Sequence, residues 1–158
     1  MKNYIKRIKR VKKKVKSRKG HVYFAHPFDT WHSKREEMIM RRIEEMGLIP
    51  INPFEEEDKL NVKYGVEHYY QRPIKPFAKD ITDRDLAMVQ SCEFYIGWYP
   101  KGVTMIGTPI EMVWACLLSK KVMAICYKPQ PFLLDHADVL FKGYKNFKEG
   151  IEYEWGEE

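Results

Sequence analysis

Four short apolar segments, separated by stretches of helical length, constrain the fold of this chain more than any other feature. The strand-like segments are HVYFAHPF (21–28), LIPIN (48–52), EFYIGWY (93–99) and KVMAICY (121–127). Apolar residues recur at helical spacing between them, at 31–46, about 77–91 and 109–121. Strands that alternate with helices pair in parallel, because each helix returns the chain to the start of the next strand. The pattern predicts an α/β fold, a three-layer sandwich around a mostly parallel sheet of about five strands.

The remaining segments give weaker signals. Pro50 cannot donate a backbone hydrogen bond, which predicts that the strand around it lies at or near a sheet edge. Residues 53–76 are polar and irregular, and we expect a lid-like excursion with one short helix there. Residues 131–141 suggest another short helix, and residues 147–155 suggest either a short fifth strand or a final helix.

The chain divides by charge into an N-terminal arm and a body. Its net charge is +6, but residues 1–20 carry eleven Lys or Arg and no acid, which leaves residues 21–158 at about −5. Apolar residues recur at helical spacing within the arm, at Tyr4, Ile5, Ile8, Val11 and Val15. A basic helix of this kind can be a solvated extension, contact nucleic acid through residues 1–19, or lie on a membrane surface. These three interpretations stay open, and we expect residues 21–158 to form a single domain.

Cysteine content and hydropathy restrict the compartment. Cys92, Cys116 and Cys126 are odd in number and lie in apolar runs, which favours reduced, buried thiols over one disulfide with a free thiol. Their spacing does not match a metal site. No apolar run approaches the roughly 20 residues of a membrane span, and the first residues lack the apolar core of a signal peptide. We expect a cytoplasmic protein without a membrane span.

The carboxyl ends of the parallel strands are the place to expect a ligand. In such sheets the site lies where the strand order reverses, which here points to the loops 25–30 (AHPFDT) and 99–108 (YPKGVTMIGT). Glu111 follows the second loop, near the start of an otherwise apolar helix. An acid in that position can complement the helix dipole, or it can be desolvated and chemically reactive.

Two further residues combine with Glu111 into a chemical hypothesis. Asp85 belongs to the preceding helix, which we expect to end near the same edge of the sheet, so that Asp85 can face Glu111. Alternatively, Asp85 is a solvated acid paired with Arg84 or Lys79. Tyr23 can hydrogen-bond Glu111 and hold its rotamer, or it can be an ordinary core tyrosine. Two carboxylates beside an anomeric carbon are the usual means of cleaving a glycosidic bond.

Three motifs, taken in order, resemble those of a known family. They are Tyr23-Phe24-Ala25-His26-Pro27-Phe28, Ile81-x-x-x-Asp85-Leu86 and Gly107-Thr108-x-x-Glu111. Their order and spacing resemble those of the nucleoside 2-deoxyribosyltransferases and of their relatives, the 2'-deoxynucleoside 5'-monophosphate N-glycosidases. The resemblance covers residues 21–128.

The resemblance implies a flavodoxin-like sheet and a mechanism. Glu111 would be the nucleophile that forms a covalent 2-deoxyribosyl-enzyme, Asp85 would handle the proton on the base, and Tyr23 would orient the nucleophile. Phe24 and Phe28 lie where such proteins place residues against the nucleobase. The resemblance also implies a deoxynucleoside or deoxynucleotide substrate, a homo-oligomer and a role in nucleotide salvage, with no metal or organic cofactor.

Departures from the family pattern concern the substrate and the acceptor. Met105 and Ile106 stand where many deoxyribosyltransferases carry an acid that recognises the base. Transfer to a second base and hydrolysis by water therefore both stay open. His26 and Asp29 lie in a loop that is usually small and contains Gly, and we expect them to adjust substrate choice.

The sequence does not decide whether the substrate is a nucleoside or its 5'-monophosphate. Thr104, Thr108, Ser33, Lys34 and Arg35 are candidates for a phosphate site together with backbone N–H groups. Gly107 precedes Thr108 in the third motif and is expected at the substrate. Thr108 can equally be an ordinary helix N-cap. A hypothesis of another class is a non-catalytic nucleotide-binding module that the basic arm tethers to nucleic acid.

Overall fold

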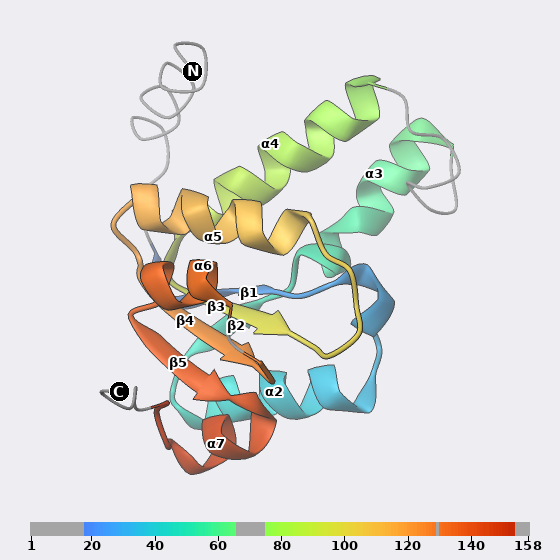
Figure 1. Cartoon of the computed structure of the whole chain (residues 1–158). Coiled ribbons are helices and arrows are strands. Elements are labelled where there is room, and N and C mark those ends of the chain that lie inside the picture. Colours follow the sequence, from blue (N-terminus) through green and yellow to red (C-terminus); the bar gives the residue numbers. More distant parts are fainter. Residues whose placement is uncertain (1–17, 66–74, 129, 154–158) are drawn as a thin grey trace.

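A parallel five-stranded sheet forms the middle layer of the structure (Figure 1). The computed structural model describes residues 18–65, 75–128 and 130–153. Within this part the strand order is β2-β1-β3-β4-β5, and every neighbouring pair runs parallel. This is the flavodoxin-like order, so the predicted three-layer α/β sandwich is confirmed.

Helices alternate with the strands along the chain. The strands are β1 (Arg18–Ala25), β2 (Ile49–Ile51), β3 (Cys92–Tyr99), β4 (Lys121–Cys126) and β5 (Val139–Lys142). The α-helices are α2 (Lys34–Glu45), α3 (Glu57–Tyr64), α4 (Lys75–Ser91), α5 (Gly107–Leu117), α6 (Pro131–His136) and α7 (Gly143–Glu149). Two short 3-10 helices, η1 (Phe28–Thr30) and η2 (Pro53–Glu56), follow the ends of β1 and β2.

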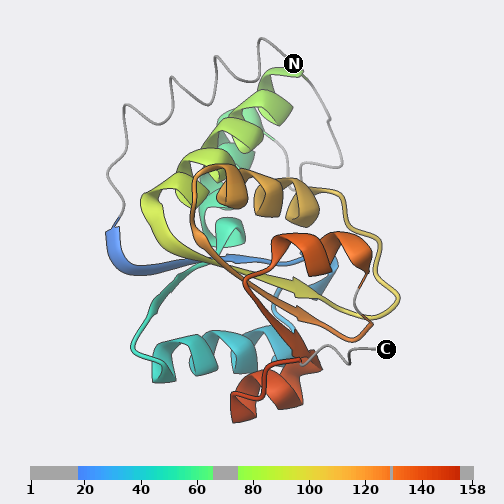
Figure 2. The same ribbon diagram turned by 60° about the vertical axis from the view of Figure 1, so that its left-hand side comes forward.

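Helices cover both faces of the sheet (Figure 2). α4 and α5 pack on one face, over a core that includes Tyr95 and Trp114. α2 and α7 pack on the other face, over a core that includes Ile39. Because successive residues of a strand point to opposite faces, β1 sends Tyr23 to the first core and Phe24 to the second. Only one of these two neighbours can therefore reach a site beside α5.

The first strand begins inside the segment that the charge pattern assigns to the arm. β1 starts at Arg18, and Gly20 within it has a φ of 76°, a left-handed conformation that glycine tolerates best. The Gly20 N–H donates to Glu93 Oε2 at 2.8 Å. The sheet thus includes the last residues of the predicted arm. Residues 1–17, on which the helical arm was predicted, lie outside the described residues.

The fifth strand lies earlier in the chain than predicted. Residues 131–141, expected as one short helix, form α6 and then most of β5. The segment 147–155 holds the end of α7, and its residues 150–153 form no strand. The strand VLFK is too short to show an alternating pattern in the sequence. In the sheet its middle residues, Leu140 and Phe141, are buried on opposite faces.

Smaller features of the sequence have clear counterparts. β2 lies at the edge of the sheet, as Pro50 predicted. The short helix expected within 53–76 corresponds to α3, while residues 66–74 lie outside the described residues. All three cysteines have free thiols, and two of them are buried, so the disulfide alternative is not found. In the described segments, no helix has the length and apolar character needed to cross a membrane.

Candidate active site

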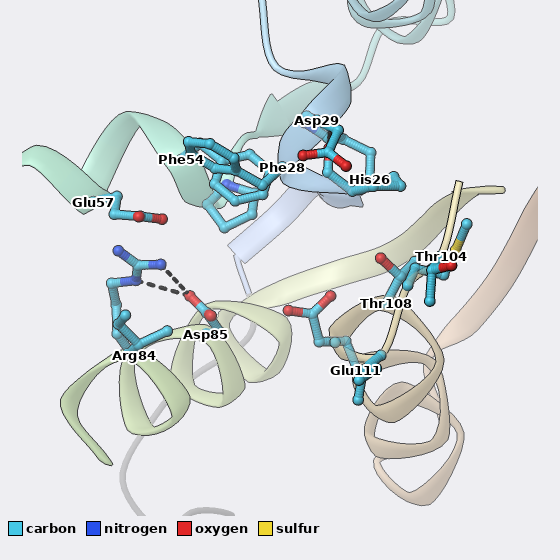
Figure 3. A pocket seen from close by; sticks show the side chains of 16 residues that line it. His26, Phe28, Asp29, Phe54, Glu57, Arg84, Asp85, Thr104, Thr108 and Glu111 are labelled. Carbon is cyan, nitrogen blue, oxygen red and sulfur yellow. Dashed lines mark hydrogen bonds and ion pairs between the residues drawn. The ribbon is translucent and has the colours of Figure 1, made fainter. Parts of the chain in front are cut away.

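A pocket of about 430 Å³ opens at the carboxyl ends of the strands. Its walls come from the loop after β1, from η2 and the start of α3, from α4, and from the β3–α5 loop with the start of α5 (Figure 3). The strand order reverses between β1 and β3, where open α/β sheets hold their ligands. Both predicted loops, 25–30 and 99–108, contribute to the pocket. Its volume is typical of a small-molecule site.

Glu111 and Tyr23 form a hydrogen bond in the wall of this pocket. Tyr23, fully buried in β1, donates to Glu111 Oε1 at 2.8 Å. α5 starts at Gly107, earlier than predicted, with Ile106 as its N-cap. Glu111 therefore lies in the second turn of the helix, and Thr108 is not the N-cap. Because the dipole acts mainly within the first turn, complementing the dipole does not explain an acid at this position.

The environment of the two acids shifts their pKa values. Burial, and then the negative charge of Asp85, raises the pKa of Glu111 to about 8, although the hydrogen bond from Tyr23 opposes the shift. Burial also raises the pKa of Asp85, against the opposing charge and hydrogen bond of Arg84. At neutral pH the Glu111 carboxyl group therefore holds a proton. Pairs of acids in such environments are typical of sites that move protons.

Asp85 is paired with Arg84, as one alternative had it, but it is a largely buried residue of the pocket and not a solvated acid. Its Oδ1 lies 2.7 Å from Arg84 Nη2 and 2.8 Å from Arg84 Nε, so the ion pair exists. Asp85 also lines the pocket together with Glu111. The helix does not end at this edge of the sheet, however. α4 continues to Ser91 and passes directly into β3 at Cys92, so Asp85 reaches the pocket from within the helix.

Aromatic side chains line the pocket opposite α4 (Figure 3). Phe28 of η1 and Phe54 of η2 pack edge to face with ring centroids 5.4 Å apart. The ring centroid of Trp31 lies 5.7 Å from the centroids of both Phe28 and Phe54. We call Phe28 and Phe54 the aromatic wall; it offers a flat ligand an apolar surface. The sequence predicted Phe28 but not Phe54, although Phe54 follows the end of β2, to which the same strand-end rule applies.

Phe24 does not reach the pocket. Its side chain is fully buried on the α2 and α7 side of the sheet, because its neighbour Tyr23 occupies the opposite face. There Phe24 stacks on His26 with ring centroids 4.7 Å apart. The structure therefore brings Phe28, but not Phe24, to the predicted base site.

His26 lies in a buried polar network beside the aromatic wall. Its Nδ1 is 2.9 Å from Thr30 Oγ1, and its Nε2 is 3.2 Å from Glu36 Oε1. The Asn52 side chain donates to the same Glu36 oxygen at 2.6 Å. These contacts join the loop after β1 to the end of β2 and to α2. His26 lines the pocket, and its network holds the loop that carries Phe28.

The other predicted substrate and phosphate residues divide into two groups. Asp29, Thr104, Gly107 and Thr108 line the pocket, next to Met105 and Ile106, which stand in place of the usual acid. Thr108 is buried, and its backbone carbonyl accepts a hydrogen bond from the Tyr95 hydroxyl at 2.8 Å. Ser33, Lys34 and Arg35 do not line the pocket, and the Ser33 side chain instead caps α2. The proposed phosphate ligands from the start of α2 are therefore not brought to the site.

Two charged residues of the pocket were missed by the sequence reasoning. The sequence presents Arg84 only as a partner of Asp85, and Glu57 only as part of a polar run. Both line the pocket, and Glu57 is 2% exposed. The spacing of Ile81, Arg84 and Asp85 is that of neighbours on one helical face, which is a signal for Arg84. No comparable signal marks Glu57.

Two solved structures have the same architecture as this chain. A 2-deoxyribosyltransferase from Bacillus psychrosaccharolyticus aligns with a TM-score of 0.62 at 13% identity, covering 85% of this chain and 93% of that chain. The CMP N-glycosidase BcmB of Clostridium botulinum aligns with a TM-score of 0.54 at 18% identity, covering 83% and 97%. This chain has the deoxyribosyltransferase fold. No protein-family model and no curated protein matches the sequence.

The deoxyribosyltransferase fold leaves the chemistry to be judged from the pocket itself. The aromatic wall can hold a flat heterocycle, and the two acids can supply a nucleophile and a proton. The buried Tyr23 hydroxyl fixes one oxygen of Glu111. Within residues 18–65, 75–128 and 130–153, no cluster of His, Cys, Asp or Glu could hold a metal ion. The arrangement suits displacement at a carbon attached to a flat leaving group.

Proposed function

We propose that this protein cleaves the N-glycosidic bond of 2'-deoxynucleosides through a covalent 2-deoxyribosyl intermediate on Glu111. The observation that carries the proposal is that Glu111, held by Tyr23, shares one pocket with a second acid, Asp85. The aromatic wall supports it, because a nucleobase can stack there. The fold adds support, because the similar structures are a 2-deoxyribosyltransferase and a CMP N-glycosidase.

The proposed reaction has two displacement steps at C1'. In the first, a Glu111 oxygen bonds to C1' while the bond from C1' to the base nitrogen breaks. The electron pair leaves with the base, and Asp85 donates the proton that lets the base depart neutral. In the second, water or another base attacks C1', the Glu111 carboxylate leaves, and Asp85 accepts the proton of the incoming group. Hydrolysis and transfer differ only in that acceptor.

The charge of the pocket favours a nucleoside over its monophosphate. Among the described lining residues, four acids (Asp29, Glu57, Asp85 and Glu111) stand against one cation, Arg84. Arg84 is already paired with Asp85. A phosphate group placed here would lose hydration among four acids, with only this already paired cation to offset its charge. We therefore propose an uncharged deoxynucleoside as the preferred substrate.

A deoxynucleoside 5'-monophosphate is the second candidate, favoured by one observation. α5 begins at Gly107 in the pocket wall, with the hydroxyl groups of Thr104 and Thr108 in the same wall. The first N–H groups of a helix are a common anion site. An assay must therefore offer both substrate forms.

The test measures base release and base exchange with separate acceptors. Wild-type protein is incubated with deoxynucleosides or their monophosphates, with and without a second free base, and the products are separated by chromatography. Glu111→Ala and Glu111→Gln should lose activity by at least about a thousandfold, while Glu44→Gln on the exposed face of α2 should keep it. A trapped deoxyribosyl adduct should map to the peptide that contains Glu111.

Two results would refute the proposal. Full activity in both Glu111 variants would exclude the mechanism even if the reaction occurred. Absence of turnover with every substrate, together with intact nucleotide binding, would favour the non-catalytic binding module.

The remaining expectations concern partners and location. Homo-oligomerisation is supported by the exposed apolar side chains of Ile110 and Leu117 on α5, which are 48% and 45% exposed, and sedimentation would test it. Nucleic-acid binding through residues 1–19 should be salt-sensitive and lost when they are deleted; vesicle binding would favour a membrane surface instead. A cytoplasmic location and a role in nucleotide salvage stay predictions.

A further inference from the structure

Arg84 has a hydrogen-bond donor that its ion pair does not use. Arg84 Nε and Nη2 both contact Asp85 Oδ1, at 2.8 and 2.7 Å, and both side chains are 16% exposed. Arg84 Nη1 is shielded from solvent and has no hydrogen-bond partner among the described residues. A buried donor without an acceptor is costly. Because Arg84 lines the pocket, a ligand that enters beside it and turns the guanidinium group toward itself can supply the missing acceptor.

Three polar groups follow one another along this side of the pocket. The two contacts from Arg84 occupy Asp85 Oδ1, which leaves Oδ2 available to a ligand. Arg84 lies next to Asp85, and the carboxylate of Glu57 faces the Arg84 guanidinium group (Figure 3). All three residues line the pocket. The order along the wall is therefore Asp85, Arg84, Glu57, and we call these three residues the polar row.

The hydrogen-bonding character of Arg84 and Glu57 is fixed by their chemistry, whereas that of Asp85 depends on whether it holds a proton. Asp85 acts as a donor when it protonates the leaving base, and a guanidinium group can only donate. The Glu57 carboxylate accepts. A base that satisfies the row must present an acceptor, a second acceptor and a donor, in that order along one edge.

Only some nucleobases carry this pattern. Cytosine presents O2, N3 and its N4 amino group, which are acceptor, acceptor and donor. Guanine and hypoxanthine present N7, O6 and N1–H, which follow the same order. Adenine (N7, the N6 amino group, N1) and thymine or uracil (O2, N3–H, O4) present a donor in the middle. That donor would meet the Arg84 guanidinium group and leave both groups unpaired.

We propose that Arg84 and Glu57 select the base, so that the pocket takes deoxynucleosides of cytosine or of 6-oxopurines and discriminates against adenine, thymine and uracil. The inference rests on the proposed function only in that the pocket holds a nucleoside with its base beside Asp85. The aromatic wall contributes contact with the face of the base, which every base has. Selection therefore depends on the polar row.

Binding to a protein that cannot react separates base selection from catalysis. We would titrate the full-length Glu111→Ala variant with deoxycytidine, deoxyguanosine, deoxyinosine, deoxyadenosine, thymidine and deoxyuridine by calorimetry. The first three should bind about 10- to 100-fold more tightly than the last three. Turnover by the wild-type protein is measured separately with the same six compounds.

Substitutions to glutamine should remove the preference. Arg84→Gln and Glu57→Gln each place an amide that can turn to donate or to accept, so neither position excludes a base any longer. In the Glu111→Ala background, the double variant Arg84→Gln/Glu57→Gln should therefore bind all six compounds with affinities within about threefold of one another. Lys79→Gln, which alters an exposed cation of the same helix, should leave the ranking unchanged. Circular dichroism and thermal unfolding would verify that each variant is folded.

The outcomes separate this inference from the proposed reaction. Equal binding of all six compounds, or binding of none, by the folded Glu111→Ala variant would overturn base selection. Base selection in that variant together with no turnover by the wild-type protein would overturn the reaction but support the selection. Turnover of deoxyadenosine as efficient as that of deoxycytidine would support the reaction and overturn the selection.

Discussion

Replacing Glu111 by Gln should stabilise the protein. The gain in the free energy of unfolding over the wild-type protein should grow as the pH rises. Burial, followed by the charge of Asp85, raises the pKa of Glu111 from 4.5 to about 8. Between these two pH values the folded protein holds a proton that the unfolded chain has released. The free energy of unfolding must therefore fall as the pH rises through this window, and it should level off above the pKa of the folded state.

The size of the effect follows from the size of the shift. At about 1.4 kcal/mol per pH unit, a change from 4.5 to about 8 corresponds to about 5 kcal/mol. This is an upper bound, because water in the open pocket screens the charge. Gln does not ionise and can still accept the hydrogen bond from Tyr23. Relative to the wild-type protein, Glu111→Gln should therefore gain about 2 to 5 kcal/mol between about pH 5 and about pH 9.

Urea denaturation at a series of pH values measures this difference directly. Groups that both proteins share cancel when the free energies of unfolding are subtracted. Glu44→Gln provides the matched control, because Glu44 is exposed on α2 and its side chain is in water in both states; it should leave the pH dependence unchanged. If the difference between Glu111→Gln and wild type were constant over the whole range, the desolvation of Glu111 would be refuted.

Three further substitutions test neighbouring features. Tyr23→Phe removes the hydrogen bond that lowers the pKa of Glu111, so the falling limb of the kcat/KM profile, where the two acids lose the proton they share, should move to higher pH; an unmoved limb would contradict the assigned role. Gly97→Ala puts a Cβ atom 2.7 Å from the Tyr99 ring, and urea denaturation should show a loss of about 1 to 3 kcal/mol, an unchanged midpoint being the contrary result. Phe54→Ala should raise KM about tenfold with kcat nearly unchanged if a base stacks there, whereas a fall in kcat alone would argue against stacking.

The fold was predictable because its signals are local and repeated. Each of the first four strands has an apolar run, and the alternation of strands and helices dictates parallel pairing. β5 was missed because four residues, Val139–Lys142, cannot show a period. The start of α5 was misplaced because Pro109 fits any of the first positions of a helix, where backbone N–H groups have no intrahelical acceptor.

The candidate site was predictable only as far as strand ends define it. The strand-end rule finds the loops that carry Phe28 and Glu111, and, applied to β2 as well, it would also have found Phe54. Strand alternation shows that Tyr23 and Phe24 cannot share a face, but not which of them faces the pocket. The spacing of Arg84 from Ile81 places it on the helical face of the pocket, but the direction of its long side chain depends on tertiary packing, and Glu57 has no local signature at all.

The position of one proton connects the ion pair of Arg84 with the proposed reaction. In the free protein the raised pKa of Glu111 keeps a proton on the nucleophile, while Arg84 favours the ionised form of Asp85. Cleavage requires the opposite arrangement, an ionised nucleophile and a protonated Asp85. Transfer between the two acids leaves their total charge unchanged, so no proton has to come from solvent.

A correctly matched base would favour that transfer. A base acceptor that takes a hydrogen bond from Arg84 competes with Asp85 for the guanidinium group, and weaker pairing raises the pKa of Asp85. The proton then moves toward Asp85, and Glu111 becomes ionised beside C1'. A base that presents a donor to Arg84 cannot produce this change. Under the proposed mechanism, discrimination between bases therefore acts on the chemical step as well as on binding, because the group that selects the base also controls the ionisation of the acid that protonates it.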